Sequence, residues 1–303
     1  MPVEVAAAVI ERADGGFLLA RRPSGKVYAG WWEFPGGKVH AGERPREALA
    51  RELDEELGIA VRRAYPWIVR EHAYAHAHVR LHFYRVVAWA GEPRAREHDA
   101  LAWCRLDAPL PEPMLPANAP VLAALRLPLE YAITDAARIG VEASLAALER
   151  RLAAGLRLVQ VRDRQLPGRE RFARQVVALA HRHGARVLVA GGPAIADGVH
   201  YSASELMRLA SRPQGGLAAA SCHTRKELER AIALGMDFAV LGPVKETPTH
   251  PEATPLGWAR FAEIVQGASI PVYAIGGLWL QDLDEARRAG AHGLAMIRGA
   301  WAG

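Results

Sequence analysis

The stretch 32-WEFPGGKVHAGERPREALARELDEELGI-59 combines a glycine pair, a run of helix-forming residues and several closely spaced carboxylates. Pro45 suits the first turn of a helix, where its missing N–H has no intrahelical partner, and Gly58 suits the position that ends one. Strong helix formers fill residues 46–57 between them. The sequence therefore predicts a helix that spans most of this stretch.

Three carboxylates of the predicted helix lie close together. At about 100° per residue, Glu52, Glu55 and Glu56 project within one sector. A neighbouring apolar stripe is available for burial and consists of Leu49, Leu53 and Leu57. Carboxylates this close repel each other, and a hard cation such as Mg²⁺ or Mn²⁺ would relieve the repulsion. The alternative is a solvated acidic helix face without a ligand. The preceding turn, 35–37, lets the backbone approach a ligand closely and would direct a carbonyl at the same ions.

The fixed positions follow the spacing G-x5-E-x7-R-E-U-x-E-E-x-G-U, where U is a bulky aliphatic residue. They are Gly37, Glu43, Arg51, Glu52, Leu53, Glu55, Glu56, Gly58 and Ile59. This pattern resembles the signature of the Nudix hydrolases without a departure. The resemblance implies an α/β/α sandwich with a mixed sheet, in which a metal-positioned water attacks a phosphorus of a nucleoside triphosphate. It implies Glu52 as general base, Arg51 as the residue that orients the carboxylates, and Gly36 (through its carbonyl), Glu52, Glu55, Glu56 and Glu97 as metal ligands.

Composition agrees with a soluble globular protein of two domains. The chain has 303 residues, of which 50% are hydrophobic and 23% charged. A leader peptide or membrane span is not expected, and two distant cysteines suit a reducing cytoplasm. The net charge of +5 comes from arginines scattered among acids, so we expect neither nucleic acid nor a membrane as a partner. Composition leaves an oligomer possible.

Two further patterns concern the strands of the first half. Residues 3–10 and 17–20 flank the turn 14–16 and predict a hairpin, which leads into Arg21 and Arg22. Residues 71–86 alternate and predict one strand with a polar face of histidines and tyrosines. Its His76-x-His78 pair leaves two interpretations open, a zinc site or a polar face beside a nucleotide cleft.

The blocks 32–38 (WEFPGGK) and 116–118 (PAN) narrow the resemblance to the MutT-type branch, over about residues 1–127. That branch hydrolyses oxidised purine nucleotides such as 8-oxo-dGTP. The resemblance implies base recognition by Arg22, Phe34 and Asn118, and Lys38 is placed to meet a phosphate. The alternative for Asn118 is a helix cap, because it precedes a predicted helix that contains residues 121–125.

The pattern changes after residue 127, which sets the domains at 1–127 and 128–303. Short apolar runs at 131–134, 156–161, 186–190, 198–200, 216–221, 238–241, 272–275 and 293–297 predict eight strands. Helix-like segments lie in most intervals, at 141–153, 169–183, 225–234 and 281–289. Alternation of this kind predicts a parallel (β/α)8 TIM-type barrel, so that the whole chain is α/β. Only residues 299–303 remain for the last helix, which is truncated.

The ends of these strands resemble the thiamine phosphate synthase and TenI family over about residues 129–300. The matching motifs are ITD (133–135), VQVRD (159–163), DGVH (197–200), SCH (221–223), GPV (242–244), TPT (247–249) and AIGG (274–277). The resemblance implies a phosphate-bearing ligand, with Gln160, Arg162, His223, Thr247, Thr249, Gly276 and Gly277 as the ligand residues.

This part of the chain also departs from the family pattern. Active synthases carry an Asn-Asp pair where residues 190–192 read Ala-Gly-Gly, so the magnesium carboxylate is missing. The family has a lysine after T-P-T, where this chain has His250. The tautomerases have a histidine where this chain has Pro243. The sequence therefore favours a barrel that has lost its catalytic activity. Two alternatives are a bifunctional thiamine-pathway enzyme and a ligand-sensing or dimerisation module.

Overall fold

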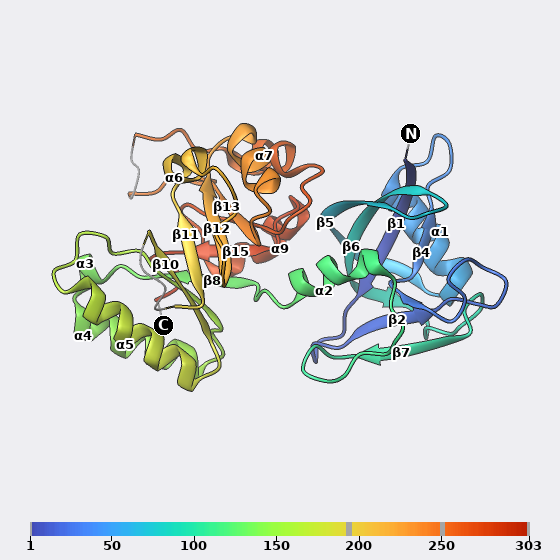
Figure 1. Cartoon of the computed structure of the whole chain (residues 1–303), viewed down its shortest axis with the longest axis horizontal. Helices are drawn as coiled ribbons and strands as arrows, with labels where there is room; N and C mark the ends of the chain where they lie inside the picture. Colours follow the sequence, from blue (N-terminus) through green and yellow to red (C-terminus); the bar gives the residue numbers. More distant parts are fainter. Residues whose placement is uncertain (1, 192–195, 249–251, 302–303) are drawn as a thin grey trace. The chain divides into compact units, whose positions relative to one another are not determined.

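The computed structural model describes residues 2–191, 196–248 and 252–301. The chain divides into two compact units, Met1–Arg126 and Leu127–Gly303, which Figure 1 shows in blue to green and in green to red. This division differs by one residue from the boundary expected from the sequence. Within the described ranges, no helix has both the length and the apolar character needed to cross a membrane.

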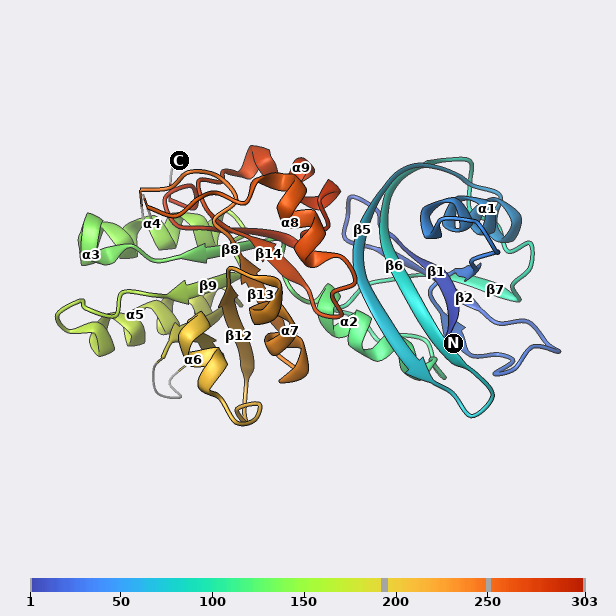
Figure 2. The same ribbon diagram turned by 90° about the horizontal axis from the view of Figure 1, so that it is seen from above.

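The amino-terminal unit contains two sheets. The first has the strand order β4 (Gly36–Lys38), β1 (Val3–Ile10), β6 (His78–Ala90) and β5 (Ala60–Ala73). It is mixed, because β1 runs parallel to β6 and antiparallel to β4. The second consists of β3 (Trp32–Glu33), β2 (Phe17–Arg21) and β7 (Ala100–Cys104). Figure 2 shows the long β5–β6 pair curving across this unit.

Strand β1 separates the two hydrophobic cores of this unit. Ala6 and Ala8 pack with the leucines of α1 (Pro45–Leu57) on one side. Ala7 and Val9 pack on the other side with α2 (Ala119–Leu125), which follows the short 3-10 helix η1 (Pro116–Asn118). Because successive side chains of a strand point to opposite faces, one apolar strand supplies both cores. The predicted α/β/α sandwich is confirmed.

Three local predictions were wrong. Strands β1 and β2 do not form a hairpin: beyond the bridge between Glu11 and Phe17 they enter different sheets, since each pairs with a strand distant in sequence. Residues 71–86 are not one strand, because a turn closed by Tyr74 N–H and Ala77 O (2.8 Å) divides them between β5 and β6. The glycines at 36 and 37 lie in β4 rather than in a turn. In each case pairing partners elsewhere in the chain decided the conformation.

The carboxy-terminal unit is a closed barrel of eight parallel strands, as predicted. In order around the barrel they are β8 (Glu130–Ile133), β9 (Leu158–Val161), β10 (Arg186–Ala190), β11 (Gly198–Tyr201), β12 (Leu217–Cys222), β13 (Phe238–Leu241), β14 (Val272–Ala274) and β15 (Gly293–Met296). The interior is filled by the alternate residues of these strands, among them Tyr131, Phe238 and Tyr273. The rings of these three residues contact one another edge-on or tilted.

Helices cover the outside of the barrel (Figures 1 and 2). They are α3 (Ala136–Ile139), α4 (Val141–Ala153), α5 (Arg169–Arg182), α6 (Ala203–Arg208), α7 (Arg225–Ala233), α8 (Gly257–Val265), the 3-10 helix η2 (Leu280–Asp282) and α9 (Leu283–Arg288). Residues 297–301 form no helix after β15. Instead, Trp301 Nε1 donates a hydrogen bond to the carbonyl oxygen of Ile133 (2.8 Å) and fixes this end of the chain to β8.

Candidate functional site

Helix α1 carries the carboxylates and is held at both ends. It begins at Pro45, and its first turn is tied by the backbone N–H of Arg44 to the Glu47 carboxylate (3.0 Å). It ends at Gly58, whose left-handed conformation (φ 71°) a side chain would disfavour. Its leucines are fully buried, so the carboxylate face of the helix is fixed toward β4 and the adjoining loop.

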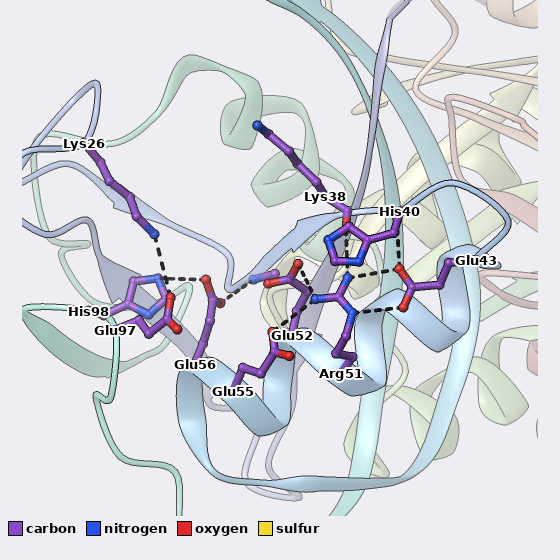
Figure 3. Close-up of polar contacts among 11 residues, drawn as sticks. Lys26, Lys38, His40, Glu43, Arg51, Glu52, Glu55, Glu56, Glu97 and His98 are labelled. Atoms are coloured by element: carbon purple, nitrogen blue, oxygen red, sulfur yellow. Dashed lines mark hydrogen bonds and ion pairs between the residues drawn. The ribbon is translucent and has the colours of Figure 1, made fainter.

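Arg51 connects the carboxylates (Figure 3). Its Nη1 donates to Glu52 Oε1 (2.9 Å) and to Glu55 Oε2 (3.1 Å). Its Nε and Nη2 donate to the two oxygens of Glu43 (3.0 Å each), and Nη2 also donates to the Lys38 carbonyl (3.0 Å). These bonds lower the pKa of Glu43 to about 2 and raise that of Arg51. One guanidinium therefore orders three carboxylates.

Glu52 lies directly against the backbone of β4. A Cβ placed on Gly37 would lie 2.2 Å from the carboxylate carbon of Glu52, so a side chain at position 37 would displace this carboxylate. Gly36 is required for a second reason, since its φ is 142° and a Cβ there would lie 2.1 Å from the Ala6 carbonyl oxygen. The glycine pair thus brings α1 and the sheet close together at Glu52.

Glu56 is the buried carboxylate of the helix, at 6% exposure. Its Oε2 accepts a hydrogen bond from the Gly36 N–H (3.1 Å). Desolvation by burial raises its pKa to about 7, a shift that nearby His98 and the Gly36 N–H partly oppose. A bound cation would stabilise the charged form of this buried carboxylate, because it would neutralise the charge that a proton otherwise neutralises.

Two residues of this site were not predicted from the sequence. The side chain of His98 is 3% exposed, and its Nε2 lies 3.9 Å from Glu56 Oε1 and 3.9 Å from Glu33 Oε1. Glu33 in turn accepts from Arg22 Nη1 at 2.6 Å. Glu33 stands inside the block 32–38 that carries the resemblance and His98 directly follows Glu97, but nothing in their spacing indicates that they meet.

The carboxylates have the right donor atoms for a divalent cation, but their oxygens do not converge on one position. In the part of the chain that is described, no three His, Cys, Asp or Glu side chains already converge on a metal position. The oxygens of Glu52 and Glu55 are directed to Arg51, and that of Glu56 to Gly36. Their hard oxygen atoms are those that Mg²⁺ and Mn²⁺ prefer. Cation binding would therefore compete with Arg51 for Glu52 and Glu55.

Two other predicted residues of this unit, Glu97 and Lys38, have side chains that lie outside the carboxylate group. Glu97 is 55% exposed and lies 3.9 Å from Lys26 Nζ, apart from the hydrogen-bonded carboxylates of α1. Lys38 contributes its carbonyl oxygen to Arg51, while its side chain points away from the carboxylates in Figure 3. The structure therefore brings Glu52, Glu55 and Glu56 into one bonded group with Arg51 and Gly36, and leaves Glu97 and the Lys38 amine outside it.

Phe34 and Asn118 are both buried. The Phe34 ring is 4% exposed and packs against Phe17 and Phe83, so it is a core residue rather than an open face for stacking. Asn118 is 3% exposed and donates from Nδ2 to the Trp32 carbonyl (3.3 Å). It makes no side-chain capping bond to α2, so the helix-cap alternative was wrong.

The two histidines of the H-x-H pattern lie at the turn between β5 and β6. His76 stacks on Tyr74, with ring centroids 5.5 Å apart. His78 Nε2 lies 3.2 Å from Glu71 Oε2. Their partners are therefore two tyrosine rings, those of Tyr74 and Tyr28, and the Glu71 carboxylate across the hairpin.

Substitution of Arg51 by lysine tests its role as the connecting residue. Lysine keeps the charge but cannot make the fork of bonds to three carboxylates. We expect the amino-terminal unit to lose about 2 kcal/mol of unfolding free energy and its hydrolytic activity to fall about tenfold or more. Thermal unfolding and pyrophosphate release measure these effects. Arg46→Lys, an exposed position on the same helix, is the matched control, and equal behaviour of the two variants would contradict this role.

The barrel contains a pocket of about 520 Å³ at the carboxyl ends of its strands. Six of the seven predicted ligand residues line it: Gln160, Arg162, His223, Thr247, Gly276 and Gly277. Thr249 lies outside the described residues. The pocket also contains residues that the sequence did not single out, notably Arg164, Trp279 and Arg298.

One polar residue deep in the pocket is His200, at 2% exposure. Its Nδ1 lies 3.1 Å from Tyr131 Oη and its Nε2 lies 2.9 Å from Ser221 Oγ. Burial lowers its pKa to about 3, so the ring is neutral. The positive charge of the pocket therefore comes from its arginines.

The geometry defines an α/β protein of two folds, one with a carboxylate helix against a glycine-rich strand and one with an arginine-lined barrel pocket. Family models match both parts, a NUDIX domain over residues 6–124 and Thiamine monophosphate synthase over residues 130–300. The chain belongs to the Nudix family in its first unit and to the thiamine monophosphate synthase family in its second.

Individual relatives match one unit each. A CTP pyrophosphohydrolase of Escherichia coli is 44% identical over 128 residues, which cover 40% of this chain and 90% of the relative. An 8-oxo-dGTP diphosphatase of the same organism is 33% identical over 124 residues, covering 41% and 96%. A putative thiamine-phosphate synthase of Geobacter sulfurreducens is 37% identical over 178 residues, covering 55% and 84%.

Proposed function

We propose that the amino-terminal unit hydrolyses a nucleoside triphosphate, with water, to the nucleoside monophosphate and pyrophosphate. The observation that carries this proposal is the buried Glu56, with its pKa raised to about 7, next to the Arg51-bound carboxylates and the glycines of β4. When bound, a divalent cation such as Mg²⁺ would offset phosphate charge and lower the pKa of a coordinated water. Glu52, Glu55, Glu56 and the Gly36 backbone would hold it, and we propose Glu97, which lies outside the bonded group in this structure, as a further ligand.

The chain's own residues divide the remaining work. Glu52, which is 14% exposed and fixed by Arg51 and Gly37, accepts the proton of the attacking water. Arg51 bridges Glu52 and Glu55 through Nη1 and offsets the repulsion between their charges; a bound cation would compete for the same oxygens. Lys38 extends from the end of β4, where it meets a phosphate of the substrate. The nucleobase is recognised by Arg22 and Asn118, and Phe34 supports this part of the site from the core.

For the substrate we propose an oxidised purine nucleotide such as 8-oxo-dGTP. Asn118 supports this choice, because the bond to the Trp32 carbonyl uses one N–H of its amide and leaves the second N–H and the oxygen for the oxidised edge of the base. The 8-oxo-dGTP diphosphatase relative supports it also. The second candidate is a pyrimidine triphosphate, which the CTP pyrophosphohydrolase relative favours.

A substrate panel of 8-oxo-dGTP, dGTP and CTP, with pyrophosphate release as the readout, separates the two candidates. We expect the highest kcat/KM for 8-oxo-dGTP. We expect Asn118→Ala to reduce its advantage over dGTP by about tenfold or more, because a buried partner of the oxidised edge is lost. If CTP has the highest kcat/KM of the three, and still has it in Asn118→Ala, the pyrimidine alternative is established instead.

We propose that the barrel no longer makes thiamine phosphate. The sequence at 190–192 lacks the carboxylate that the resemblance implies for magnesium. Pro243 bears on the tautomerase alternative instead, because it stands where the histidine of the tautomerases is expected. Incubation of the full chain with the pyrimidine diphosphate and the thiazole phosphate should yield no thiamine phosphate. Product formation that Arg162→Ala abolishes would restore the bifunctional alternative.

A further inference from the structure

His98 is buried in the amino-terminal unit although it lies in the loop between β6 and β7. Its side chain is 3% exposed. The backbone of this loop is anchored on both sides of the histidine. The Arg96 N–H donates to the Glu56 carbonyl of α1 (3.0 Å). The Asp99 N–H donates to the Arg21 carbonyl of β2 (3.0 Å). The imidazole is therefore held at a fixed place between α1 and β2.

The ring of His98 faces two carboxylates at once. Its Nε2 lies 3.9 Å from Glu33 Oε1 and 3.9 Å from Glu56 Oε1, and Figure 3 shows the contact with Glu56. The second oxygen of each carboxylate is bonded elsewhere. Glu33 Oε2 accepts from Arg22 Nη1 (2.6 Å), and Glu56 Oε2 accepts from the Gly36 N–H (3.1 Å). One ring nitrogen therefore stands between the carboxylate that orders Arg22 and the buried carboxylate of α1.

The surroundings of the ring decide what Nε2 does. Among the described residues, the buried Nδ1 has no hydrogen-bond partner, whereas Nε2 faces two carboxylate oxygens. A bare lone pair on Nε2 would be repelled by both, so Nε2 carries a hydrogen whether the ring is neutral or charged. Both contacts are longer than a hydrogen bond, and a single N–H is directed at one acceptor at a time. Glu33 and Glu56 therefore compete for one donor.

Arg22 is ordered by Glu33 and in turn orders the loop that follows it. Its Nε donates to the Val27 carbonyl (2.8 Å), and its backbone N–H donates to the Trp31 carbonyl (2.9 Å). A Glu33 carboxylate that turned away from Arg22 would release the guanidinium. A donor that steadies Glu33, such as His98 Nε2, therefore steadies Arg22 also.

We propose that His98 is a positioning residue that links nucleobase binding to the carboxylate helix, by sharing one N–H between Glu33 and Glu56. The link rests on the function proposed for the amino-terminal unit. When Glu56 turns to a bound cation, the N–H is left to Glu33, which then holds Arg22 in place for the nucleobase. Because coupling between two binding sites is reciprocal, nucleobase binding favours cation binding by the same factor.

Calorimetric titration of the full chain with nucleosides tests this link, because a nucleoside has the base but no phosphate that could bind Mg²⁺ itself. The probes are 8-oxo-deoxyguanosine and cytidine, at pH 8, where Glu56 is deprotonated. We expect the preferred nucleoside to bind about fivefold or more tightly in Mg²⁺ than in EDTA. His98→Leu keeps the apolar volume but removes the donor, so we expect it to abolish this difference and to leave the weaker affinity.

A conservative variant separates positioning from the filling of the core. Glutamine carries an N–H at a reach similar to that of Nε2, so His98→Gln should keep the nucleoside Kd within about twofold. In an Arg22→Ala background, His98→Leu should have no further effect, because the residue that it orders is gone. His82→Leu is the matched control, since it removes a histidine that pairs with Glu4 (2.5 Å) in the same unit, and it should leave nucleoside binding unchanged.

The outcomes separate the link from the proposed function. Equal affinity in Mg²⁺ and EDTA, or a His98→Leu variant that keeps the Mg²⁺ effect, refutes the link while hydrolysis stands. So does equal loss of binding in His98→Leu and His98→Gln when thermal unfolding shows both variants folded, because the histidine then serves packing alone. Binding of neither nucleoside, with pyrophosphate still released from the nucleotide panel, also refutes the link. Absence of pyrophosphate release from every nucleotide refutes the proposed function, and the link with it.

Discussion

Replacement of Glu52 by glutamine is expected to lower kcat for pyrophosphate release by about 10²- to 10⁴-fold, the range that a general base contributes. Glutamine has nearly the same shape and keeps an oxygen for Arg51 Nη1, so the contact with Gly37 is preserved. The substitution removes the ability to accept a proton. KM should change little, because Glu52 acts on the water rather than on the base or sugar.

The control for this variant lies on the same helix. Asp54 is exposed on α1 and is not part of the Arg51 network, so Asp54→Asn removes one negative charge without entering the site. We expect it to retain activity within about twofold. Rates are measured at saturating nucleotide and saturating Mg²⁺, so that weakened cation binding does not imitate the loss of the base. If kcat for pyrophosphate release in Glu52→Gln equals that in Asp54→Asn, Glu52 is excluded as the base.

The second large effect is a pH dependence of stability that comes from Glu56. Its pKa is about 7 in the folded protein and 4.5 as an ordinary carboxyl group. Between these values the folded state holds a proton that the unfolded state has lost, so unfolding free energy falls as pH rises. Between a pH below 4.5 and a pH above 7, the unfolding free energy falls by about 3 kcal/mol in total because of this shift. In EDTA the amino-terminal unit should therefore unfold at a lower temperature at pH 8 than at pH 5.

Two observations separate Glu56 from its neighbours Glu33, Glu52 and His98. Glu56→Gln, which is neutral at every pH, should remove most of this slope and raise stability at pH 8. In the unchanged protein, Mg²⁺ should restore stability at pH 8 far more than at pH 5, because the cation needs the deprotonated carboxylate. Calorimetric scans across this pH range measure both effects. An equal slope in Glu56→Gln would show that another group titrates.

The two units differ in how their sites depend on the backbone. In the first unit, function would rest on a helix whose side chains contact a two-glycine strand, so small changes at Gly36 or Gly37 act directly on Glu52 and Glu56. In the second unit, the pocket is built by the ends of strands around a packed aromatic interior. Its scaffold therefore persists when individual strand-end residues change, as at Gly191 and Pro243, where this sequence departs from the family pattern.

The sequence by itself determined the α/β class, both architectures and the helix over residues 45–57. Helix periodicity and the alternation of short apolar runs with helical segments are local properties, so they can be read without knowing any contact. The eight barrel strands were found within a residue or two of their ends for the same reason. The fixed spacing of Arg51, Glu52 and Glu56 also predicted that these side chains group on one helix, because a helix places these positions predictably.

Only the tertiary structure decided which residues meet across long separations. It placed β1 and β2 in different sheets, divided residues 71–86 into two strands, and moved Phe34 into the core. It brought His98 and Glu33 to Glu56, and Arg164 to Glu205 beside Gly191. Strand pairing and burial depend on partners far along the chain, and local propensity carries no information about them. The charge environment of each site, and therefore its chemistry, was decided by folding rather than by spacing.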